Sequence, residues 1–510
     1  MSLSKIKKQK IFQQLAEFGY FSEQLPPCFN SKMYSDNIFE LTKHIGSMTV
    51  TSPVSLSIYK NEKSRRIISV PNPKEFTRTL NLYKSNWNTI RRYTKSNNSH
   101  SKITKFDYSY NEFIDSIVFK DVHQIGSGYL ENLLVSIVKS AGYRYCLKVD
   151  IANFYNSIYT HSISWAICGK EEAKKMFFGK ITKSKDYILS EELDTHMCSL
   201  KSNETNGIIV GPYTSRIFSE ILLAKVDQEL GNLNLRFTRY VDDYNFYFKS
   251  RLEIQNNLPK IQAVLSKYNL ALNESKTEIL EFPYHNYSNM SRVYKLAYEE
   301  NNILGVLNEA GILFNNGEKG AYKYALKLFE NTSFPTEQAE AVLALLVNIL
   351  LLAPQHGRYV IPYIIKNIDT IGKEKISVII NEELVVCSNN NLQQETLMLL
   401  YLAREIEMNI DGNALLNILK SGDDFSIIIA LDIWKNHYER IQNSTFFQMD
   451  LIDAVHNVFN ALKSCDYLGE HWLLLYESEI HNLNPNKDYV YPEKDDFFKK
   501  MKELNITFYS

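Results

Sequence analysis

Arg236-Phe-Thr-Arg-Tyr-Val-Asp-Asp-Tyr-Asn-Phe-Tyr-Phe248 is the stretch of this chain that decides the fold. Aromatic and β-branched residues flank two adjacent acids, Asp242 and Asp243, and this pattern predicts a β-hairpin with the acids at its tip. Carboxylates held at a hairpin tip can share a divalent cation. Acidic pairs at turns are also common as solvated surface groups, so the hairpin alone leaves both interpretations open.

A further acid stands upstream, at the end of an apolar strand predicted over Tyr145–Val149. Asp150 follows this strand, and the aromatic pair Phe154-Tyr155 comes shortly after it. One carboxylate from the strand and one from the hairpin are the minimum set for holding two Mg²⁺ ions, with Mn²⁺ as the alternative.

Nucleotidyl transfer is the chemistry that needs such a pair of ions. One metal activates the attacking 3′-hydroxyl while the other neutralises the triphosphate, so the two lie ~3.5–4 Å apart. We predict that Asp150, Ile151 and Asp242 form the metal site. Asp243 is predicted to give electrostatic support, so that the catalytic residues are Asp150, Asp242 and Asp243.

Tyr155 is a candidate for selecting the sugar of the nucleotide. If Asp150 faces the metals, the ring of Tyr155 lies where a bound sugar would be, and it would clash with a ribose 2′-hydroxyl. This predicts a preference for deoxynucleotides. The alternative is a core tyrosine beside Phe154.

Two more segments are predicted to contact the nucleotide. Gly211-Pro212 leads from a loop into a helix, and small residues there let the backbone approach a base pair closely. Lys276 follows the hairpin by about one helix and could protonate the pyrophosphate leaving group. An ordinary helix start and a surface lysine are the respective alternatives.

The segment Ser55–Pro71 predicts two short strands around a polar turn. An arginine fork fits phosphate oxygens well, and such a hairpin could fold over the active site. Arg66 is the favoured triphosphate ligand, with Lys63 and Arg65 as weaker candidates. A solvated hairpin face would explain the same charges.

In this order, the segments resemble the successive fingers and palm motifs of the reverse transcriptases. The matching motifs are Arg66-x-Ile68-x-x-Pro71, Asp150 with Phe154-Tyr155, Gly211-Pro212 with Ser215, Tyr240-Val241-Asp242-Asp243, and Asn273-x-x-Lys276-Thr277. The resemblance covers roughly residues 50 to 285 and implies metal binding by Asp150 and Asp242. It also implies catalytic support by Asp243 and sugar discrimination by Tyr155.

One departure from the family pattern concerns the template side of the site. A Gln-Gly pair that is usual before Gly211 in the retron and group II intron enzymes is absent, and Asn206-Gly207 stands nearby.

The rest of the chain is predicted to be helical. After about Pro283, apolar residues recur at helical spacing, as in Glu337–Leu352 and Leu392–Glu407. We therefore expect an α+β protein in which a right-hand polymerase of fingers and palm precedes an all-α, HEAT-like helical array. An ordinary helical bundle is the alternative, since no strict repeat is present. The expected domains are a basic helical segment at 1–50, fingers and palm at 51–285, and helical repeats at 286–510.

Composition favours a soluble chain that works on nucleic acid. The net charge of −1 conceals two unlike ends, because residues 1–100 hold 16 Lys and Arg against 6 Asp and Glu, and residues 401–510 hold 10 against 18. A basic N-terminal part can track phosphates. No Cys-x-x-Cys pair occurs among the six cysteines, so reduced thiols are expected.

We expect a cytoplasmic protein with no membrane partner. The longest apolar stretch, 341–353, is shorter than the ~20 residues that span a bilayer. The N-terminus does not resemble a secretion signal.

A reverse-transcriptase palm followed by some two hundred residues of helices resembles the abortive-infection (AbiK-like) and related defence-associated reverse transcriptases. The resemblance implies antiphage defence, homo-oligomers, and DNA synthesis from dNTPs that starts on a tyrosine hydroxyl of the protein. Synthesis in that group is template-independent or copies a non-coding RNA. Tyr20, Tyr34 and Tyr509 lie in segments that could reach the palm, although the 33 tyrosines leave the choice open.

Three other functions stay open at this stage. The first is a retron-like enzyme that copies a structured RNA from a nucleic-acid primer. The second is a catalytically silent RNA-binding scaffold whose working part is the helical array. An RNA-dependent RNA polymerase is the third, and Tyr155 argues against it.

Overall fold

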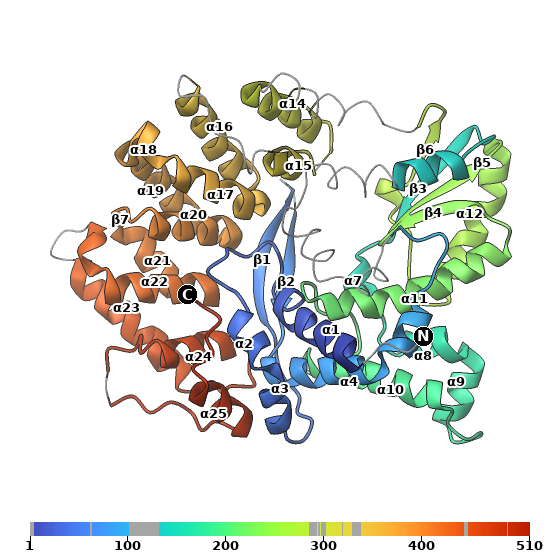
Figure 1. Ribbon diagram of the computed structural model, residues 1–510, viewed down its shortest axis with the longest axis horizontal. Coiled ribbons are helices and arrows are strands. Elements are labelled where there is room, and N and C mark those ends of the chain that lie inside the picture. The colour runs from blue at the N-terminus through green and yellow to red at the C-terminus, as the bar shows by residue number, and fades with distance from the viewer. Residues whose placement is uncertain are drawn as a thin grey trace. The chain divides into compact units, whose positions relative to one another are not determined.

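The computed structural model describes residues 5–61, 64–100, 132–284, 293, 296, 302–318, 320–328, 338–442, 447–486 and 488–510 (Figure 1). The chain forms two compact units. Unit 1 comprises residues 1–20, 47–51 and 73–287, and unit 2 comprises residues 21–46, 52–72 and 288–510.

The centre of unit 1 is a four-stranded antiparallel sheet in the order β4-β5-β3-β6. The strands are β3 (Tyr145–Asp150), β4 (Phe237–Tyr240), β5 (Asp243–Phe248) and β6 (Glu278–Glu281). Aromatic and β-branched side chains supply the strands, and the rings of Tyr244 and Phe246 stack with centroids 5.6 Å apart. The hairpin predicted around the acidic pair and the strand predicted before Asp150 are both confirmed.

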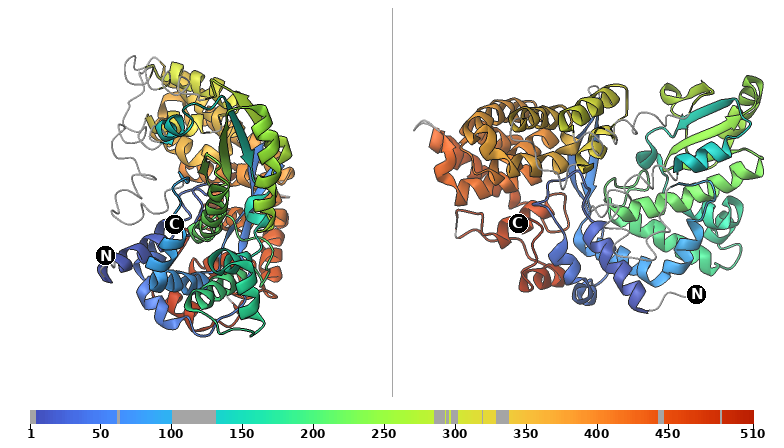
Figure 2. Two further views of the ribbon diagram at one scale, coloured as in Figure 1. Left: turned by 90° about the vertical axis from the view of Figure 1, so that its right-hand side faces the viewer. Right: turned by 45° about the horizontal axis from the view of Figure 1, so that its top comes forward.

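The described residues of unit 1 also form helices. They are α1 (Lys5–Phe18), α4 (Pro73–Tyr93), α7 (Phe154–Ser157), α8 (Ser162–Cys168), α9 (Lys170–Phe177), α10 (Lys185–Ser199), α11 (Tyr213–Asn232) and α12 (Arg251–Ser266). Helix α12 runs alongside the sheet and contacts β5 (Figures 1 and 2). Helix α11 contacts α4, α8 and α12, and most of its side chains are buried, so it is the central helix of the unit.

Unit 2 contains the hairpin predicted over Ser55–Pro71, as strands β1 (Val54–Asn61) and β2 (Ser64–Val70). It also contains α2 (Lys32–Asp36), α3 (Ile38–Leu41) and the helices that follow residue 302. Backbone amides of β1 bond to the first turn of α20 (Gln393–Glu405): Ser57 N–H donates to Gln393 Oε1 at 2.6 Å and Tyr59 N–H donates to Gln394 Oε1 at 2.9 Å.

Two rows of helices form the array of unit 2 (Figure 2, yellow to red). One row holds α14 (Ile303–Asn315), α16 (Ala339–Leu352), α18 (Ile368–Ile371), α19 (Lys373–Asn389), α21 (Gly412–Ser421) and α23 (Phe447–Leu462), and the other holds α15 (Ala321–Leu328), α17 (Gly357–Lys366), α20, α22 (Asp424–Asn436) and α24 (Trp472–Ile480). Helices contact their neighbours along each row, and across the rows α14 contacts α15, α16 contacts α17, α19 contacts α20 and α21 contacts α22. This stacking is HEAT-like, which favours the array over an ordinary bundle.

The expected fold class is confirmed: a mixed α+β polymerase region precedes an all-α array. The division of the chain differs from the three consecutive segments predicted. Residues 21–46 and 52–72 group with the helices after residue 288, because the hairpin is hydrogen-bonded to α20. Near residue 285 the predicted boundary and the observed one lie within a few residues of each other.

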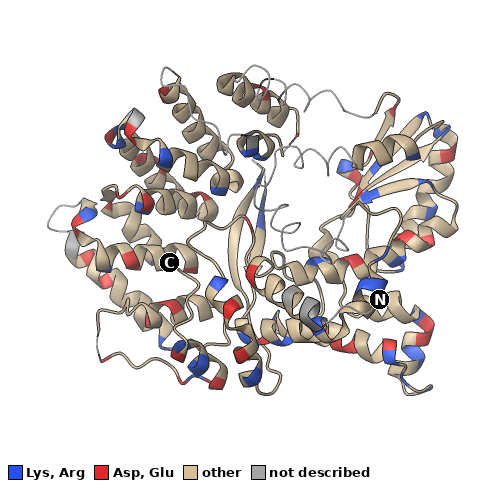
Figure 3. Ribbon diagram, viewed as in Figure 1, with Lys and Arg blue, Asp and Glu red and all other residues tan. Residues whose placement is uncertain are grey.

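Three properties expected from composition can be compared with the described residues. No single helix there is long and apolar enough to span a membrane, although α16 and residues 354–366 meet the length and composition test together, with a bend of 116° between them. All six cysteines are free thiols. Acidic and basic residues occur together on several helices of unit 2, among them α19, α20 and α25 (Asp496–Glu503) (Figure 3).

Candidate active site

Two of the predicted acids lie opposite each other on neighbouring strands of the sheet in unit 1. In the antiparallel register of β3 and β5, Asp150 is the partner of Asp243, and Tyr240 on β4 is also opposite Asp243. Asp150 is 8% exposed, whereas Asp243 is exposed at the end of its strand. The convergence of the strand acid with the hairpin acids, on which the polymerase interpretation depends, is therefore present.

The hairpin tip consists of Val241 and Asp242. Val241 has a φ of +54°, which lies in the left-handed region. A β-branched residue adopts this conformation only under constraint, and such strain is concentrated at functional sites. The tight turn places Asp242 directly beside Asp243, so three acids from two strands gather at one end of the sheet.

The predicted Asn273-x-x-Lys276 motif wraps around Asp150. Asn273 donates its backbone N–H to the Asp150 carbonyl at 2.8 Å and its side-chain amide to Asp150 Oδ2 at 3.0 Å. Lys276 Nζ lies 3.0 Å from the same carboxylate oxygen. The amide contact of Asn273 is a functional feature that sequence reasoning missed. The role of Lys276 as a proton donor to pyrophosphate stays a prediction, since its ammonium pairs with Asp150.

The surroundings of Asp243 at the hairpin tip change the pKa of its carboxyl group. Burial and the charges of Asp242 and Asp150 raise the pKa of Asp243 to about 6, against a partial offset from Lys276. Because the Asp243 side chain keeps an exposed face, we attribute more of the raised pKa to the neighbouring carboxylates than to desolvation. The site holds more negative charge than its own residues neutralise.

This donor set fits a divalent metal ion. Carboxylate oxygens are the hard ligands that Mg²⁺ and Mn²⁺ prefer, and the unneutralised charge around Asp243 favours a cation. Among the described residues, no three His, Cys, Asp or Glu side chains already surround a common point as metal ligands do. Asp150 and Asp242 would hold the ion together with water and substrate oxygens, and a bound ion supplies activation of the attacking hydroxyl.

Ile151 is placed beside the acids by an isolated antiparallel bridge to Leu272. Its side chain is 1% exposed, so only its backbone could contribute to a metal site. The assignment of Ile151 to the metal site stays a prediction.

Tyr155 lies between the acids and helix α11. The left-handed Asn153, at a φ of +47°, starts the short helix α7 that carries Tyr155. Burial raises the pKa of the Tyr155 phenol, a hydrogen bond with Ser219 of α11 opposes the shift, and the charge of Asp242 adds to it. The ring is thus within electrostatic reach of Asp242, as a sugar-selecting residue must be.

Gly211 and Pro212 precede α11, as predicted. Gly211 has a φ of +134°, a conformation that favours glycine, and Pro212 is the N-cap residue of the helix. The neighbouring Gly207 packs so closely that a Cβ atom there would lie 2.9 Å from the Asn156 carbonyl oxygen. Its φ of +77° adds to the requirement for glycine. The Asn206-Gly207 departure therefore has a structural reason in this chain.

Two of the predicted triphosphate ligands, Arg65 and Arg66, lie on β2 of unit 2. Arg66 is exposed, whereas Arg65 forms a two-pronged ion pair with Glu395 of α20, at 2.9 and 2.6 Å. Lys63 lies outside the described residues. Contact of Arg66 with a nucleotide stays a prediction, and Arg65 is held by the helical array.

The three tyrosines suggested as primers are buried. Tyr20 and Tyr34 are 0% exposed, and Tyr509 is 3% exposed with its hydroxyl donating to Asp432 Oδ2 at 2.7 Å. A phenol in such surroundings cannot attack a nucleotide without local unfolding. Among the described residues, Tyr240 and Tyr438 are the tyrosines with more than a third of their surface exposed, at 53% and 39%.

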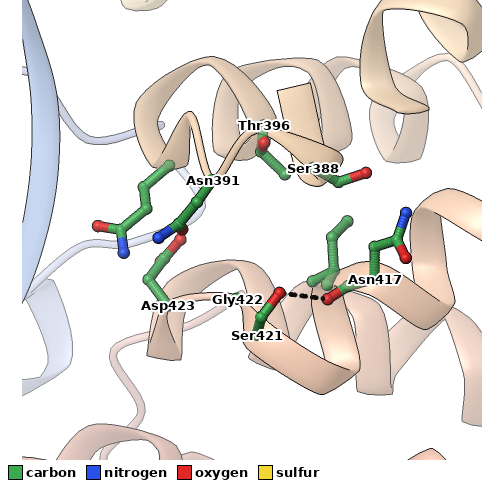
Figure 4. A pocket seen from close by; sticks show the side chains of 9 residues that line it. Ser388, Asn391, Thr396, Asn417, Ser421, Gly422 and Asp423 are labelled. Carbon is green, nitrogen blue, oxygen red and sulfur yellow. Dashed lines mark hydrogen bonds between the residues drawn. The ribbon is translucent and has the colours of Figure 1, made fainter. Parts of the chain in front are cut away.

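A small hollow lies in unit 2 (Figure 4). Asn391 from the connection between α19 and α20, Asn417 of α21 and Asp423 before α22 are among the residues that line it. It has room for little more than a single water molecule. Asp423 serves there as the N-cap of α22, so we assign the hollow no chemistry.

Sequence reasoning also missed Arg239, which lies on β4 below the hairpin tip. Its side chain is 0% exposed and bonds to Glu220 and Asp227 of α11. A charged residue inside an otherwise apolar strand was the signal that could have identified it, because buried charges require partners.

Comparison with known families identifies this region. Residues 58–307 match the family model described as reverse transcriptase (RNA-dependent DNA polymerase). The matched residues contain all three acids and every motif from Ile58 to the end of β6. No curated protein matches the chain.

Among solved structures, three telomerases are similar to parts of the chain. A truncated apo telomerase from Candida tropicalis is 18% identical, with 51% of this chain and 56% of that chain covered and a TM-score of 0.29. The longer apo telomerase from Candida tropicalis is 14% identical, with 80% and 72% covered and a TM-score of 0.31. Telomerase from Candida albicans, solved with a TWJ fragment of telomeric RNA, is 12% identical, with 66% and 68% covered and a TM-score of 0.28. Likenesses at these scores carry no conclusion about this chain.

Proposed function

We propose that the protein polymerises dNTPs into DNA with two divalent metal ions. Residues 58–307 match the reverse transcriptase family, so the chain is a nucleotidyltransferase. The observation that carries this proposal is the convergence of Asp150 from β3 with Asp242 and Asp243 from the hairpin. The carboxylates gathered at that point favour metal binding, and Mg²⁺ is the ion we expect, with Mn²⁺ as the alternative. The matched family is described as RNA-dependent DNA polymerase, and RNA is therefore the template we favour.

The biological role we infer is antiphage defence by abortive infection. The resemblance of the motifs to the AbiK-like enzymes supports this role, together with the succession of polymerase domain and HEAT-like array. Bacteria that express the wild-type chain should then resist phage, and bacteria that express Asp242→Asn should not. Equal plating of phage on both strains would remove the defence proposal and leave the polymerase proposal intact.

Priming from a tyrosine hydroxyl is the mode of initiation we propose. Burial of Tyr20, Tyr34 and Tyr509 directs the choice to other tyrosines, of which Tyr240 is exposed and lies two residues before Asp242. A phenol can replace a sugar hydroxyl once a metal lowers its pKa. We expect a homo-oligomer in the cytoplasm, and light scattering of the purified protein tests the assembly.

The deciding experiment incubates purified protein with Mg²⁺ and each labelled dNTP separately, before and after RNase treatment. Label that stays with denatured protein through phenol extraction supports covalent priming, whereas freely extracted DNA supports the retron-like enzyme with a nucleic-acid primer. Loss of incorporation after RNase treatment would indicate an RNA template, and incorporation that persists would indicate template-independent synthesis. Asp242→Asn is the inactive control, and incorporation that survives in this variant would contradict the assignment of the site.

A catalytically silent RNA-binding scaffold is the second candidate. The two-row array of unit 2 favours it, since stacked helix pairs commonly present extended binding surfaces. This function predicts that RNA binding and the biological effect both survive Asp242→Asn. The three like charges retained at the tip argue against it, because a silent palm has no need of them.

A further inference from the structure

The turn that carries the catalytic acids is strained, and one buried side chain holds it. Val241 has a φ of +54°, a conformation that a β-branched residue rarely adopts. Arg239 Nη1 donates a hydrogen bond to the Val241 carbonyl oxygen at 2.9 Å. The guanidinium is 0% exposed and this bond is partly buried, so leaving the donor without an acceptor would be costly.

The remaining donors of Arg239 are fixed by two acids of helix α11. Nε donates to Asp227 at 2.9 Å and Nη2 to the same carboxylate at 2.8 Å. Nη1 and Nη2 donate to the two oxygens of Glu220 at 3.0 and 2.7 Å. All five N–H groups of the guanidinium therefore have acceptors, which leaves the side chain a single position.

The two acids are themselves held in place. Tyr244 donates its hydroxyl to Asp227 Oδ1 at 3.1 Å, and Ser99 donates to Glu220 Oε1 at 2.8 Å. The Arg239 backbone is also fixed, since its N–H donates to the Asn98 carbonyl at 2.8 Å. The cluster thus joins helix α11, which follows the predicted nucleotide-binding loop, to the hairpin that bears the acids.

We propose that Arg239 is a positioning residue that holds the Val241 turn and thereby directs Asp242 and Asp243 toward a bound metal, with Glu220 and Asp227 as its anchor. The inference rests on the proposed function. Arg239 touches neither substrate nor metal, and its effect passes through the Val241 carbonyl. A lysine at this position would keep the charge beside the two acids but could not supply the planar fork that also reaches the turn.

The test compares the full-length Arg239→Lys variant with the wild type. We expect a folded protein by circular dichroism, with DNA synthesis reduced at least about 10-fold and a several-fold higher Mg²⁺ concentration for half-maximal rate. Arg236→Lys is the matched control, because Arg236 is exposed at the start of the same hairpin. Its guanidinium lies over the Tyr143 ring at 5.1 Å and 3.4 Å from the Lys139 carbonyl. That control should behave as the wild type. An unchanged Mg²⁺ dependence in Arg239→Lys would overturn the proposal.

A double variant separates positioning from general stabilisation of the fold. Glycine adopts a positive φ without strain, so adding Val241→Gly to Arg239→Lys should lower the Mg²⁺ requirement again and restore part of the rate. If Arg239 merely stabilises the core, a change at the turn restores nothing, and that result would also overturn the proposal.

Binding of Mn²⁺, followed by the electron paramagnetic resonance of the free ion, gives a readout that does not need DNA synthesis. We expect Arg239→Lys to bind Mn²⁺ several-fold more weakly than the wild type does. A wild type that binds Mn²⁺ but makes no DNA would refute the proposed function alone. Equal Mn²⁺ affinity in the two proteins would refute the positioning role.

Discussion

Asp150 at the end of β3 lies directly opposite Asp243 at the start of β5, with Asp242 one residue away on the hairpin turn. Residues paired across an antiparallel sheet have neighbouring side chains on one face. A pair of like charges in such a position destabilises the sheet, so its presence calls for a function that uses it. Binding of a divalent cation is the function that converts this repulsion into attraction.

The acids should be indispensable for nucleotide transfer. We expect Asp150→Asn and Asp242→Asn each to lower the rate of dNMP incorporation by at least about 100-fold, since each removes a charged oxygen from the metal site. Incorporation is measured with a labelled dNTP at saturating Mg²⁺. Asp186→Asn, an exposed acid on α10, is the matched control and should retain full activity. Activity within a few-fold of the wild type in Asp242→Asn would place the chemistry elsewhere.

Removing the charge of Asp243 should stabilise the fold and abolish DNA synthesis. The pKa of Asp243 is about 6 in the folded protein and about 3.9 in an unfolded chain, so the folded state binds the proton more tightly. The contribution of Asp243 to the free energy of unfolding therefore falls as pH rises from about 4 to 6. Above pH 6 the ionised Asp243 destabilises the fold to its full extent.

We thus expect Asp243→Asn to melt slightly higher than the wild type at pH 7.5, with a gain below about 1 kcal/mol because the side chain is partly exposed. The gain should disappear near pH 4, where both proteins carry a neutral group. Thermal melts at the two pH values measure this difference, with Asp186→Asn as the control. Added Mg²⁺ should raise the melting temperature of the wild type more than that of Asp243→Asn. A lower melting temperature of Asp243→Asn at pH 7.5 would contradict the raised pKa.

The local pattern of the sequence predicted the strands and the hairpin, because alternation and turn residues act over a few positions. Tyr145–Val149 and the stretch around Asp242 both have this short-range signal. The convergence of the acids was expected from the chemistry of a shared metal site. The pattern could not give the register that pairs Asp150 with Asp243, since register depends on packing of the whole sheet. Nor could it give the burial of Arg239, whose partners come from a different helix.

Long-range contacts also decided the division of the chain into units. The hairpin Ser55–Pro71 was predicted as part of the polymerase region, on the basis of its sequence position. The reverse transcriptase match includes this hairpin from residue 58, and its β1 edge also bonds to Gln393 and Gln394, more than three hundred residues away in the sequence. Glutamine side chains that complete a strand edge have no periodic signal, so no local pattern could have indicated them.

Tyr155 should control the choice of sugar through its ring. We expect Tyr155→Ala to raise the incorporation of ribonucleotides relative to deoxynucleotides by at least about 10-fold, because the ring no longer excludes the 2′-hydroxyl. Competition between labelled rNTP and dNTP measures the ratio. Tyr155→Phe is the matched control: it loses the hydroxyl that bonds with Ser219 but keeps the ring, so selectivity should be retained. Equal use of both sugars by the wild type would show that Tyr155 has no such role.

The helical array should stabilise the β1–β2 hairpin through the pair of Arg65 with Glu395. Both prongs of this pair are short, at 2.9 and 2.6 Å, and the side chains are 27% and 11% exposed. A double-mutant cycle with Arg65→Met and Glu395→Gln should give a coupling of roughly 0.5–3 kcal/mol, since two-pronged pairs out of bulk water are the strong ones.

Hydrogen exchange of the peptide that covers β1 provides the local measurement for this cycle. The Ser57 and Tyr59 amides bond to the first turn of α20, so they should exchange faster in Glu395→Gln than in the wild type. Lys375 and Glu340 form an exposed pair at 3.2 Å in the same array, and changing either should leave β1 exchange unaltered. If β1 exchanged at the wild-type rate in Glu395→Gln, the ion pair would be a passive surface contact, and Gln393 and Gln394 alone would hold the hairpin.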